Sequence, residues 1–199
     1  MGKVSTGFSM SLDGFVAGPN DDVTQVFAWM SRGDTKVDSS TGDHEIDLKM
    51  SEESAEMFED AVQALGALVA GRHLFDITGG WGGKHPANVP VVVVTHHVPQ
   101  EWVDRPGSPF TFVTDGVESA IRKAQEIAGD KMVAIASPTI LQQALKLGLV
   151  DEIHIDMAHY LLGGGVSMFD HLGIAPVELE ATRIIQAPGV THMDFRILK

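Results

Sequence analysis

The sequence predicts an α/β fold, a mostly parallel sheet flanked by helices with a C-terminal antiparallel hairpin. Three observations support this fold class. Strand-like and helix-like segments alternate along the chain, which favours parallel strands joined by crossover helices. The apolar runs 67–70 and 90–95 are continuous rather than alternating, as in strands buried on both faces. Segments 177–186 and 191–198 flank the turn signal Pro188-Gly189 and therefore predict a hairpin.

The other elements follow from periodicity and from capping residues. Further strands are expected at 3–10, 110–114, 131–136 and 151–157. Helices are expected at 24–30, 51–65, 116–128 and 138–147. Residues 31–49 are polar and weakly periodic, so we expect a long loop that is either mobile or a lid. A short helical turn is expected at 169–172.

Composition limits the classes of function. The chain has 199 residues and a net charge of −13, which makes nucleic acid and anionic membranes unsuitable partners. It has no cysteine, so disulfides and thiolate chemistry are excluded. With no signal peptide pattern and no apolar run long enough to span a bilayer, we expect a single cytoplasmic domain over residues 1–199.

One turn concentrates the features of an anion site. The apolar run 67–70 ends at Gly71, and Arg72-His73 stand where a helix would begin. A helix start offers unpaired N–H groups, and a guanidinium beside it suits a phosphate. The alternative is an ordinary strand-to-helix turn with a surface arginine, paired for example with Asp76 or Glu59.

Other polar positions are more ambiguous. Asp13 either acts in catalysis or holds the Asp13-Gly14 turn through an Asx hydrogen bond. The pair His96-His97 follows a strand but lacks a clear third ligand, so we expect no metal. The acidic residues of the 51–65 helix are expected to form a solvated face; they are Glu52, Glu53, Glu56, Glu59 and Asp60.

Four motifs in this order resemble one family. They occupy residues 11–18 (SLDGFVAG), 71–76 (GRHLFD), 147–154 (LGLVDEIH) and 161–170 (LLGGGVSMFD). Together they resemble the dihydrofolate reductase-like fold, and most of all the reductase domain of the riboflavin-biosynthesis deaminase/reductase and its stand-alone relatives. The resemblance runs from Val4 to the end of the chain.

The resemblance implies NADPH as the cofactor. The nicotinamide would lie near Ser9, and the phosphates near Arg72 and the turn at Ser137. The full set of cofactor-binding residues that it implies is Ser9, Val16, Ala17, Gly71, Arg72, His73, Thr95, His96, Ala136, Ser137, Thr139, Gly163 and Gly164. The turn at 136–138 departs from the family pattern, because it lacks the usual paired glycines and Pro138 removes an N–H donor.

The resemblance also implies a reaction, hydride transfer from NADPH to a small heterocyclic or imine-type metabolite. The family's namesake reaction reduces 5-amino-6-(5-phosphoribosylamino)uracil. Phe15 and Trp81 could stack on a planar substrate or anchor the loops. Asp13 or water would supply the proton.

A phosphorylated substrate would need a second basic site. Candidates for it are Arg32, Lys36, Lys84 and His85. The competing hypothesis is a protein of the same fold that binds a nucleotide or pterin without turnover.

The family resemblance also leads us to expect a homodimer. Candidate surface comes from the closing hairpin and from the apolar alternation of Ile153, Ile155 and Met157.

Overall fold

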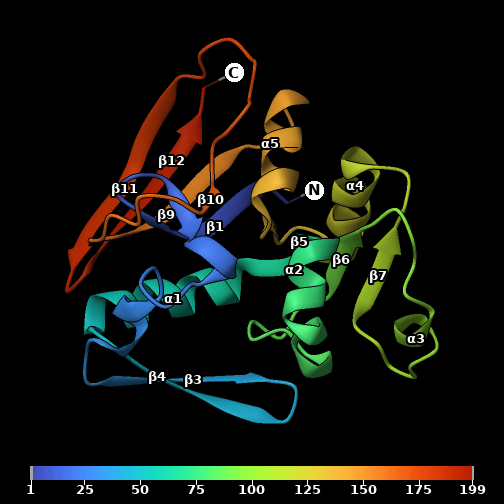
Figure 1. The fold of residues 1–199 in the computed structure, drawn as a ribbon, viewed down its shortest axis with the longest axis horizontal. Coiled ribbons are helices and arrows are strands. Elements are labelled where there is room, and N and C mark those ends of the chain that lie inside the picture. Colours follow the sequence, from blue (N-terminus) through green and yellow to red (C-terminus); the bar gives the residue numbers. More distant parts are fainter. Residues whose placement is uncertain (1, 199) are drawn as a thin grey trace.

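The computed structural model describes residues 2–198 and is built around one eight-stranded sheet (Figure 1). The sheet strands are β1 Val4–Ser11, β5 Leu65–Gly71, β6 Val91–Val94, β7 Phe110–Val113, β8 Met132–Ile135, β9 Glu152–Ala158, β11 Leu179–Ala187 and β12 Val190–Ile197. Their order across the sheet is β11-β12-β9-β1-β8-β5-β6-β7. The strands from β9 to β7 pair in parallel, and β12 and β11 add the antiparallel edge. The predicted fold class is confirmed.

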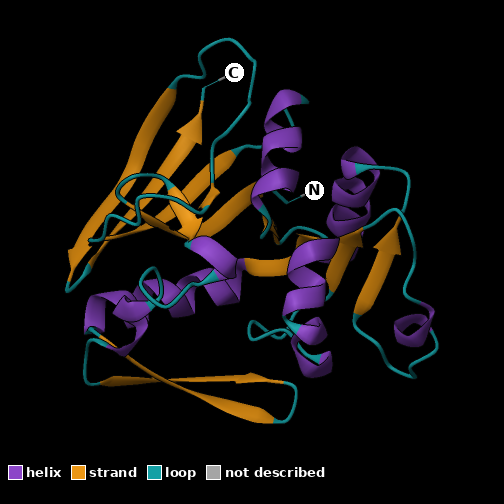
Figure 2. Ribbon diagram, in the orientation of Figure 1, coloured by secondary structure: helices purple, strands orange, loops and turns teal. Residues whose placement is uncertain are grey.

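Helices cover both faces of this sheet (Figure 2). They are α1 Glu52–Ala64, α2 Arg72–Ile77, α3 Gln100–Val103, α4 Val117–Ala128 and α5 Pro138–Lys146. Ala67 and Val69 of β5 pack in one core cluster with α4 and α5, whereas Leu68 and Ala70 pack in another with Phe75 of α2. This explains the continuous apolar run, because β5 is buried on both faces. None of the described helices is long and apolar enough to cross a membrane.

The prediction of a loop over residues 31–49 is wrong. The segment forms a two-stranded antiparallel hairpin of β3 Thr35–Thr41 and β4 His44–Met50. Val37, Leu48 and Met50 are buried in a small second core with Trp29. Most of the other hairpin side chains are polar, and many are exposed. In β4, Ile46, Leu48 and Met50 alternate with Asp47 and Lys49, a strand signal that the sequence prediction missed, whereas β3 has only Val37 buried.

Two short helices were also predicted wrongly. Residues 24–30 form a turn followed by the 3₁₀ helix Ala28–Ser31, because Asp22 accepts hydrogen bonds from both the backbone N–H and the hydroxyl of Thr24. Residues 169–172 form bends, and His171 has a positive φ of 48°, which interrupts a right-handed helix.

The remaining short elements surround the first loop. They are β2 Phe15–Ala17, β10 Val166–Ser167, and the 3₁₀ segments Pro19–Asp21 and Gly79–Gly83. Strand β10 pairs with β2, which places the glycine-rich segment beside the loop that follows β1.

Candidate active site

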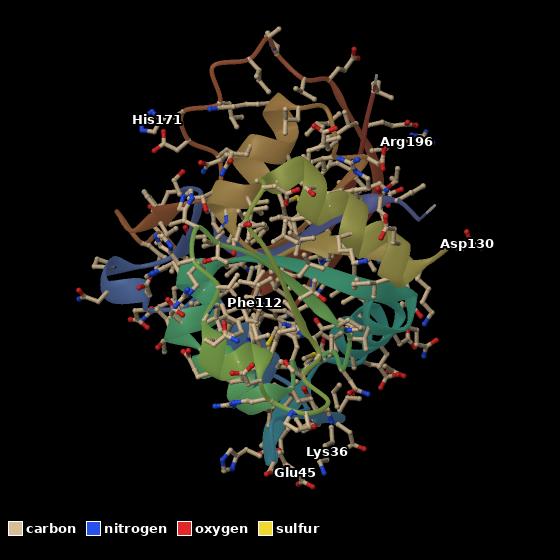
Figure 3. The ribbon with its side chains drawn as sticks, turned by 90° about the vertical axis from the view of Figure 1, so that its right-hand side faces the viewer. Lys36, Glu45, Phe112, Asp130, His171 and Arg196 are labelled. Carbon is tan, nitrogen blue, oxygen red and sulfur yellow. The ribbon has the colours of Figure 1, made fainter. Side chains whose placement is uncertain are left out.

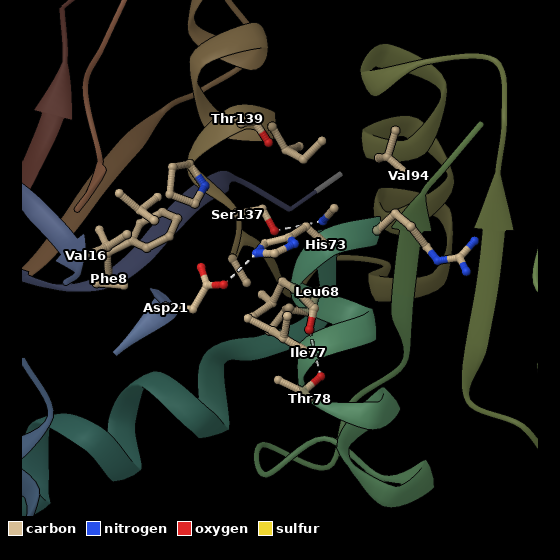
Figure 4. A pocket seen from close by; sticks show the side chains of 18 of the residues that line it. Phe8, Val16, Asp21, Leu68, His73, Ile77, Thr78, Val94, Ser137 and Thr139 are labelled. Carbon is tan, nitrogen blue, oxygen red and sulfur yellow. Dashed lines mark hydrogen bonds and ion pairs between the residues drawn. The ribbon is translucent and has the colours of Figure 1, made fainter. Parts of the chain in front are cut away.

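A cavity of about 1210 Å³ opens at the carboxyl ends of the central parallel strands (Figure 4). Gly71 at the end of β5, Thr95 after β6 and Ser137 after β8 all line it. Ligands of open α/β sheets bind outside the carboxyl ends of the strands, where loops and helix starts converge. The location and the size both suit a dinucleotide with a second small molecule beside it.

Most of the residues expected from the sequence meet in this cavity. Twelve of the sixteen line it: Ser9, Val16, Ala17, Gly71, Arg72, His73, Trp81, Thr95, His96, Ala136, Ser137 and Thr139. The other four, Asp13, Phe15, Gly163 and Gly164, lie outside it.

The turns after β5 and β8 are joined by a buried hydrogen bond. The Gly71 N–H donates to the Ser137 hydroxyl at 2.8 Å, and Ser137 is only 4% exposed. Ser137 therefore fixes the two turns against each other. The first turn of α5, including the exposed Thr139, faces the cavity at this point. The start of α4 also lines the cavity, through Gly116 and Val117.

Arg72 is held across the ends of β5 and β6. Its Nε donates to Asp76 at 2.7 Å, and its Nη1 donates to the His97 carbonyl at 2.8 Å. The pairing with Asp76 that the sequence left open is therefore present. No residue among 2–198 accepts a hydrogen bond from Nη2, so the guanidinium keeps donors for a ligand. A partly exposed ion pair of this kind stabilises a fold by only about 0–1 kcal/mol.

Asp13 lies outside the cavity, and its contacts favour a structural role over the catalytic alternative that the sequence left open. Its carboxylate accepts hydrogen bonds from the Ser11 hydroxyl at 2.6 Å, the Leu162 N–H at 3.0 Å and the Gly163 N–H at 2.7 Å. The hydrogen bond from Ser11, followed by that from Leu162, lowers the pKa of Asp13 to about 2. The group is therefore ionised near neutral pH and anchors the glycine-rich loop.

The glycine-rich loop serves packing rather than the cavity. Gly165 has a φ of +134°, and a Cβ at this position would lie 2.0 Å from the Ala17 carbonyl oxygen. Glycine is needed there because the loop backbone lies directly against β2. The expectation that Gly163 and Gly164 contact a cofactor is not supported by their positions.

The two aromatic candidates differ. Phe15 lies in β2, outside the cavity. Trp81 lines the cavity, but its ring also packs in an aromatic cluster, 4.8 Å from the His85 ring and 6.3 Å from the Phe75 ring between centroids. Trp81 is therefore a loop anchor with one part available to a ligand.

The expected second basic site does not form. Arg32, Lys36 and Lys84 do not line the cavity, and the Lys84 ammonium donates instead to Ser40 at 3.1 Å. Figure 3 shows Lys36 at the periphery of the molecule. His85 does line the cavity, but burial lowers its pKa to about 4, so the ring is neutral near pH 7.

The acidic face of α1 lies in solvent, as the sequence predicts. All five carboxylates of this helix are exposed, and none lines the main cavity. The helix instead presents Ser54 to the interior, where its hydroxyl lies 2.8 Å from Nε2 of the buried His192.

Sequence reasoning missed a buried polar network behind Ser9. The Trp29 indole N–H donates to the Ser9 hydroxyl at 3.0 Å, and the Trp29 ring stands edge-on to His192 with 5.1 Å between centroids. His192 Nδ1 lies 2.6 Å from Asp156 Oδ1. No described residue accepts a hydrogen bond from the Ser9 hydroxyl, so that proton can be donated into the cavity.

Asp156 also binds a second histidine. His154 Nε2 lies 2.9 Å from Asp156, and its Nδ1 lies 2.5 Å from Asp194. Burial lowers the pKa of His154, but the hydrogen bonds to Asp156 and Asp194 outweigh it and raise the pKa to about 10. Burial likewise raises the pKa of Asp156, and its two histidine partners reverse this, leaving the pKa below the usual range. The alternation over 151–157 placed His154 and Asp156 on one face, but their partners Asp194 and His192 on β12 come only from tertiary structure.

The structure adds an apolar mouth that the sequence did not indicate. Val23, Phe27 and Ile77 are 41%, 40% and 52% exposed, and all three line the cavity. Asp21 and His73 also line the cavity and contact each other: His73 Nε2 lies 3.0 Å from the Asp21 carboxylate (Figure 4). The exposure of these side chains cannot be read from the sequence, which shows only that Val23 and Phe27 stand near Asp21 and Asp22.

Among the described residues, no group of three or more His, Cys, Asp or Glu side chains is arranged to hold a metal ion.

A second, smaller cavity of about 420 Å³ lies between α1 and the sheet. The residues that line it include Phe58, His154 and Arg183.

The strand order and the helices around the sheet form a dihydrofolate reductase-like fold. The model of the RibD C-terminal domain matches residues 3–192, and the chain belongs to this family. A comparison with curated proteins gives no significant match.

Solved structures share this fold along the whole chain. A riboflavin biosynthesis protein from Shewanella sp. PV-4 is 20% identical, with a TM-score of 0.74 and 100% of both chains covered. The diaminohydroxyphosphoribosylaminopyrimidine deaminase/5-amino-6-(5-phosphoribosylamino)uracil reductase of Thermotoga maritima is 12% identical, with a TM-score of 0.63; 99% of this chain spans 57% of that one. A dihydrofolate reductase from Enterococcus faecalis, complexed with NADP(H), is 12% identical, with a TM-score of 0.61 and coverage of 99% and 97%.

Proposed function

We propose that this protein is an NADPH-dependent reductase that transfers a hydride to a small heterocyclic or imine-type acceptor. The family supports a reductase related to the riboflavin pathway. The observation that supports the cofactor most strongly is the junction of Arg72 with the two turns joined by the Gly71–Ser137 hydrogen bond. This junction combines a cation with free donors and a helix start in a chain whose net charge is −13.

The residues present fit NADPH, and each part of the cavity has a distinct task. Arg72 and the first turn of α5 at Thr139 would bind phosphate groups, and the strand end at Thr95 would lie beside the adenosine. The half-buried Val16 and the buried Ala17 would form an apolar wall against the nicotinamide. The bound cofactor would supply the hydride.

The protein's own contribution to the reaction is positioning. Trp29 orients the Ser9 hydroxyl, whose proton would be donated to a carbonyl or carboxamide oxygen in the cavity. Because Asp13 is ionised and lies outside the cavity, we assign the proton of the reduced product to water. The contact between Asp21 and His73 at the cavity would limit solvent access to the reacting atoms.

Arg72→Ala is expected to weaken NADPH binding roughly 10- to 150-fold, because a charge-assisted hydrogen bond contributes about 1.5–3 kcal/mol. The stability of the fold should change by less than about 1 kcal/mol, since the ion pair with Asp76 is partly exposed. Isothermal titration and a melting curve on one sample measure both effects. Arg122→Ala is the control, because Arg122 is exposed on α4 and does not line the cavity.

The same titrations compare cofactors. If a cation at the strand ends binds the extra phosphate, NADPH stabilises the wild-type protein more than NADH does. Ligand at about 100 times its dissociation constant adds roughly 2.7 kcal/mol. Equal stabilisation by both nucleotides, together with an unchanged NADPH affinity in Arg72→Ala, would contradict the phosphate site.

One observation favours a binding protein without turnover as a second candidate. Asp13, the candidate for a catalytic acid, lies outside the cavity, and its pKa is lowered to about 2. Loss of absorbance by NADPH in the presence of heterocyclic acceptors would distinguish a reductase from such a binding protein.

The assembly remains a proposal. Ile153 and Ile155 are buried in the core, so they cannot supply the dimer surface that the sequence suggested. A homodimer would therefore use the exposed edge strand β11, on which Leu179 and Ile184 are 41% and 61% exposed.

A further inference from the structure

The charges around the main cavity are distributed unevenly. Arg72 is the only lysine or arginine among its described lining residues, and it is bound at the ends of β5 and β6. If the cofactor phosphates lie against Arg72, as in the proposed function, the rest of the described cavity lining has no permanent cation. This second part of the cavity, called the acceptor half, is lined by residues of the segment 19–27 and by the C-terminal end of α2.

The ionisable groups near this second half do not favour an anion. Asp21 contributes a carboxylate, and the His73 ring already lies 3.0 Å from it. His85 is uncharged near neutral pH, since burial lowers its pKa to about 4. A phosphate dianion placed here would face the Asp21 carboxylate without a lysine or arginine to pair with it.

The same half is instead rich in exposed apolar surface. Val23 and Phe27 belong to the segment 19–27, and Ile77 is the last residue of α2; all three line the cavity. Figure 4 shows Ile77 close to Thr78 and on the side away from Thr139. Large apolar side chains that are exposed around one concave opening indicate contact with an apolar ligand.

We propose that the acceptor is an uncharged molecule with an apolar or aromatic body, and that it carries no phosphate group. The inference rests on the proposed function, because the cofactor must occupy the Arg72 half of the cavity. It separates this chain from a reductase of phosphoribosylated pyrimidines, since the acceptor half offers no partner for a sugar phosphate.

The test uses protein saturated with NADP⁺ and two probes. N-phenyl-1-naphthylamine is an uncharged aromatic whose fluorescence rises in an apolar site, and ribose 5-phosphate represents the sugar phosphate. We expect the dye to bind the saturated protein with a micromolar dissociation constant. Millimolar ribose 5-phosphate should neither displace the dye nor raise the melting temperature.

Matched variants locate the dye. Ile77→Ser should weaken dye binding at least fivefold, whereas Ile127→Ser, at an exposed isoleucine of α4 outside the cavity, should change it by less than twofold. Both side chains are exposed, so both variants should fold.

The outcomes are distinct. Absence of dye binding, equal binding to the two variants, or stabilisation by ribose 5-phosphate would overturn the proposal while leaving NADP⁺ binding intact. Failure of NADP⁺ itself to bind, measured first in the same sample, would contradict the proposed function and the inference together.

Discussion

Replacing Thr139 with glutamate is expected to lower the affinity for NADPH by about 100-fold without destabilising the fold. Thr139 is exposed in the first turn of α5 and lines the cavity beside the Gly71–Ser137 junction. Two like charges about 5 Å apart at an effective dielectric constant of about 20 repel by roughly 3 kcal/mol. The helix itself should tolerate the change, because a carboxylate in its first turn interacts favourably with the helix dipole.

Thr139→Gln is the matched control, since glutamine has the shape of glutamate without its charge. Isothermal titration with NADPH should give near wild-type affinity for Thr139→Gln and a large loss for Thr139→Glu. Melting curves of both variants should stay close to that of the wild type. Equal affinities of the two variants would show that the phosphates do not lie at the start of α5.

Asp156→Ala is expected to lower the free energy of unfolding by about 3–5 kcal/mol near pH 7. Asp156 is 8% exposed and accepts hydrogen bonds from His154 and His192. Removing Asp156 takes the acceptor from His154 Nε2 and from the buried His192 Nδ1, while His154 keeps Asp194 and His192 keeps Ser54. Breaking a buried pair by removing one partner costs about 3–5 kcal/mol. Denaturant unfolding of the variant and the wild type measures it.

The pH dependence gives this prediction a second readout. The pKa of His154 is about 10 in the folded protein and near 6.5 when unperturbed. Its stabilising contribution is therefore complete below about pH 6.5 and is lost as the pH rises through 10. The difference in the free energy of unfolding between the wild type and Asp156→Ala should therefore become smaller as the pH rises from about 6.5 to 10.

Asp38→Ala is the surface control, because the Asp38 side chain is 95% exposed and pairs only with Lys36. It should lose less than about 1 kcal/mol. If Asp156→Ala also lowered the free energy of unfolding by less than about 1 kcal/mol, the result would contradict the structural role of the buried network.

The sequence predicted the sheet well because its strands lie in the core. A strand buried on both faces must be apolar throughout, so runs such as 67–70 and 90–95 are unambiguous. The hairpin of β3 and β4 was missed because its composition is mostly polar, although Ile46, Leu48 and Met50 alternate along β4. Its few buried residues pack against neighbouring elements, among them Trp29 of the 3₁₀ segment 28–31.

The cavity residues also fall into two groups, those that the sequence could predict and those that it could not. Gly71, Arg72 and Ser137 were predictable because each follows a recognisable strand at its carboxyl end. The role of Asp13 could not be predicted, because its partners Leu162 and Gly163 lie about 150 positions away in the chain. The missing second basic site has the same cause, because only the fold shows which lysines and arginines face the cavity.

The central claim is that NADPH binds at the carboxyl ends of β5, β6 and β8, and amide chemical shifts of isotope-labelled protein test it most directly. On titration with NADPH, the backbone amide signals of Gly71, Val94 and Thr139 should shift progressively and then level off as the site becomes saturated. Signals of Phe58 and Thr182, which line the second cavity, should stay in place. Shifts confined to the second cavity, or none at all at millimolar NADPH, would contradict the account.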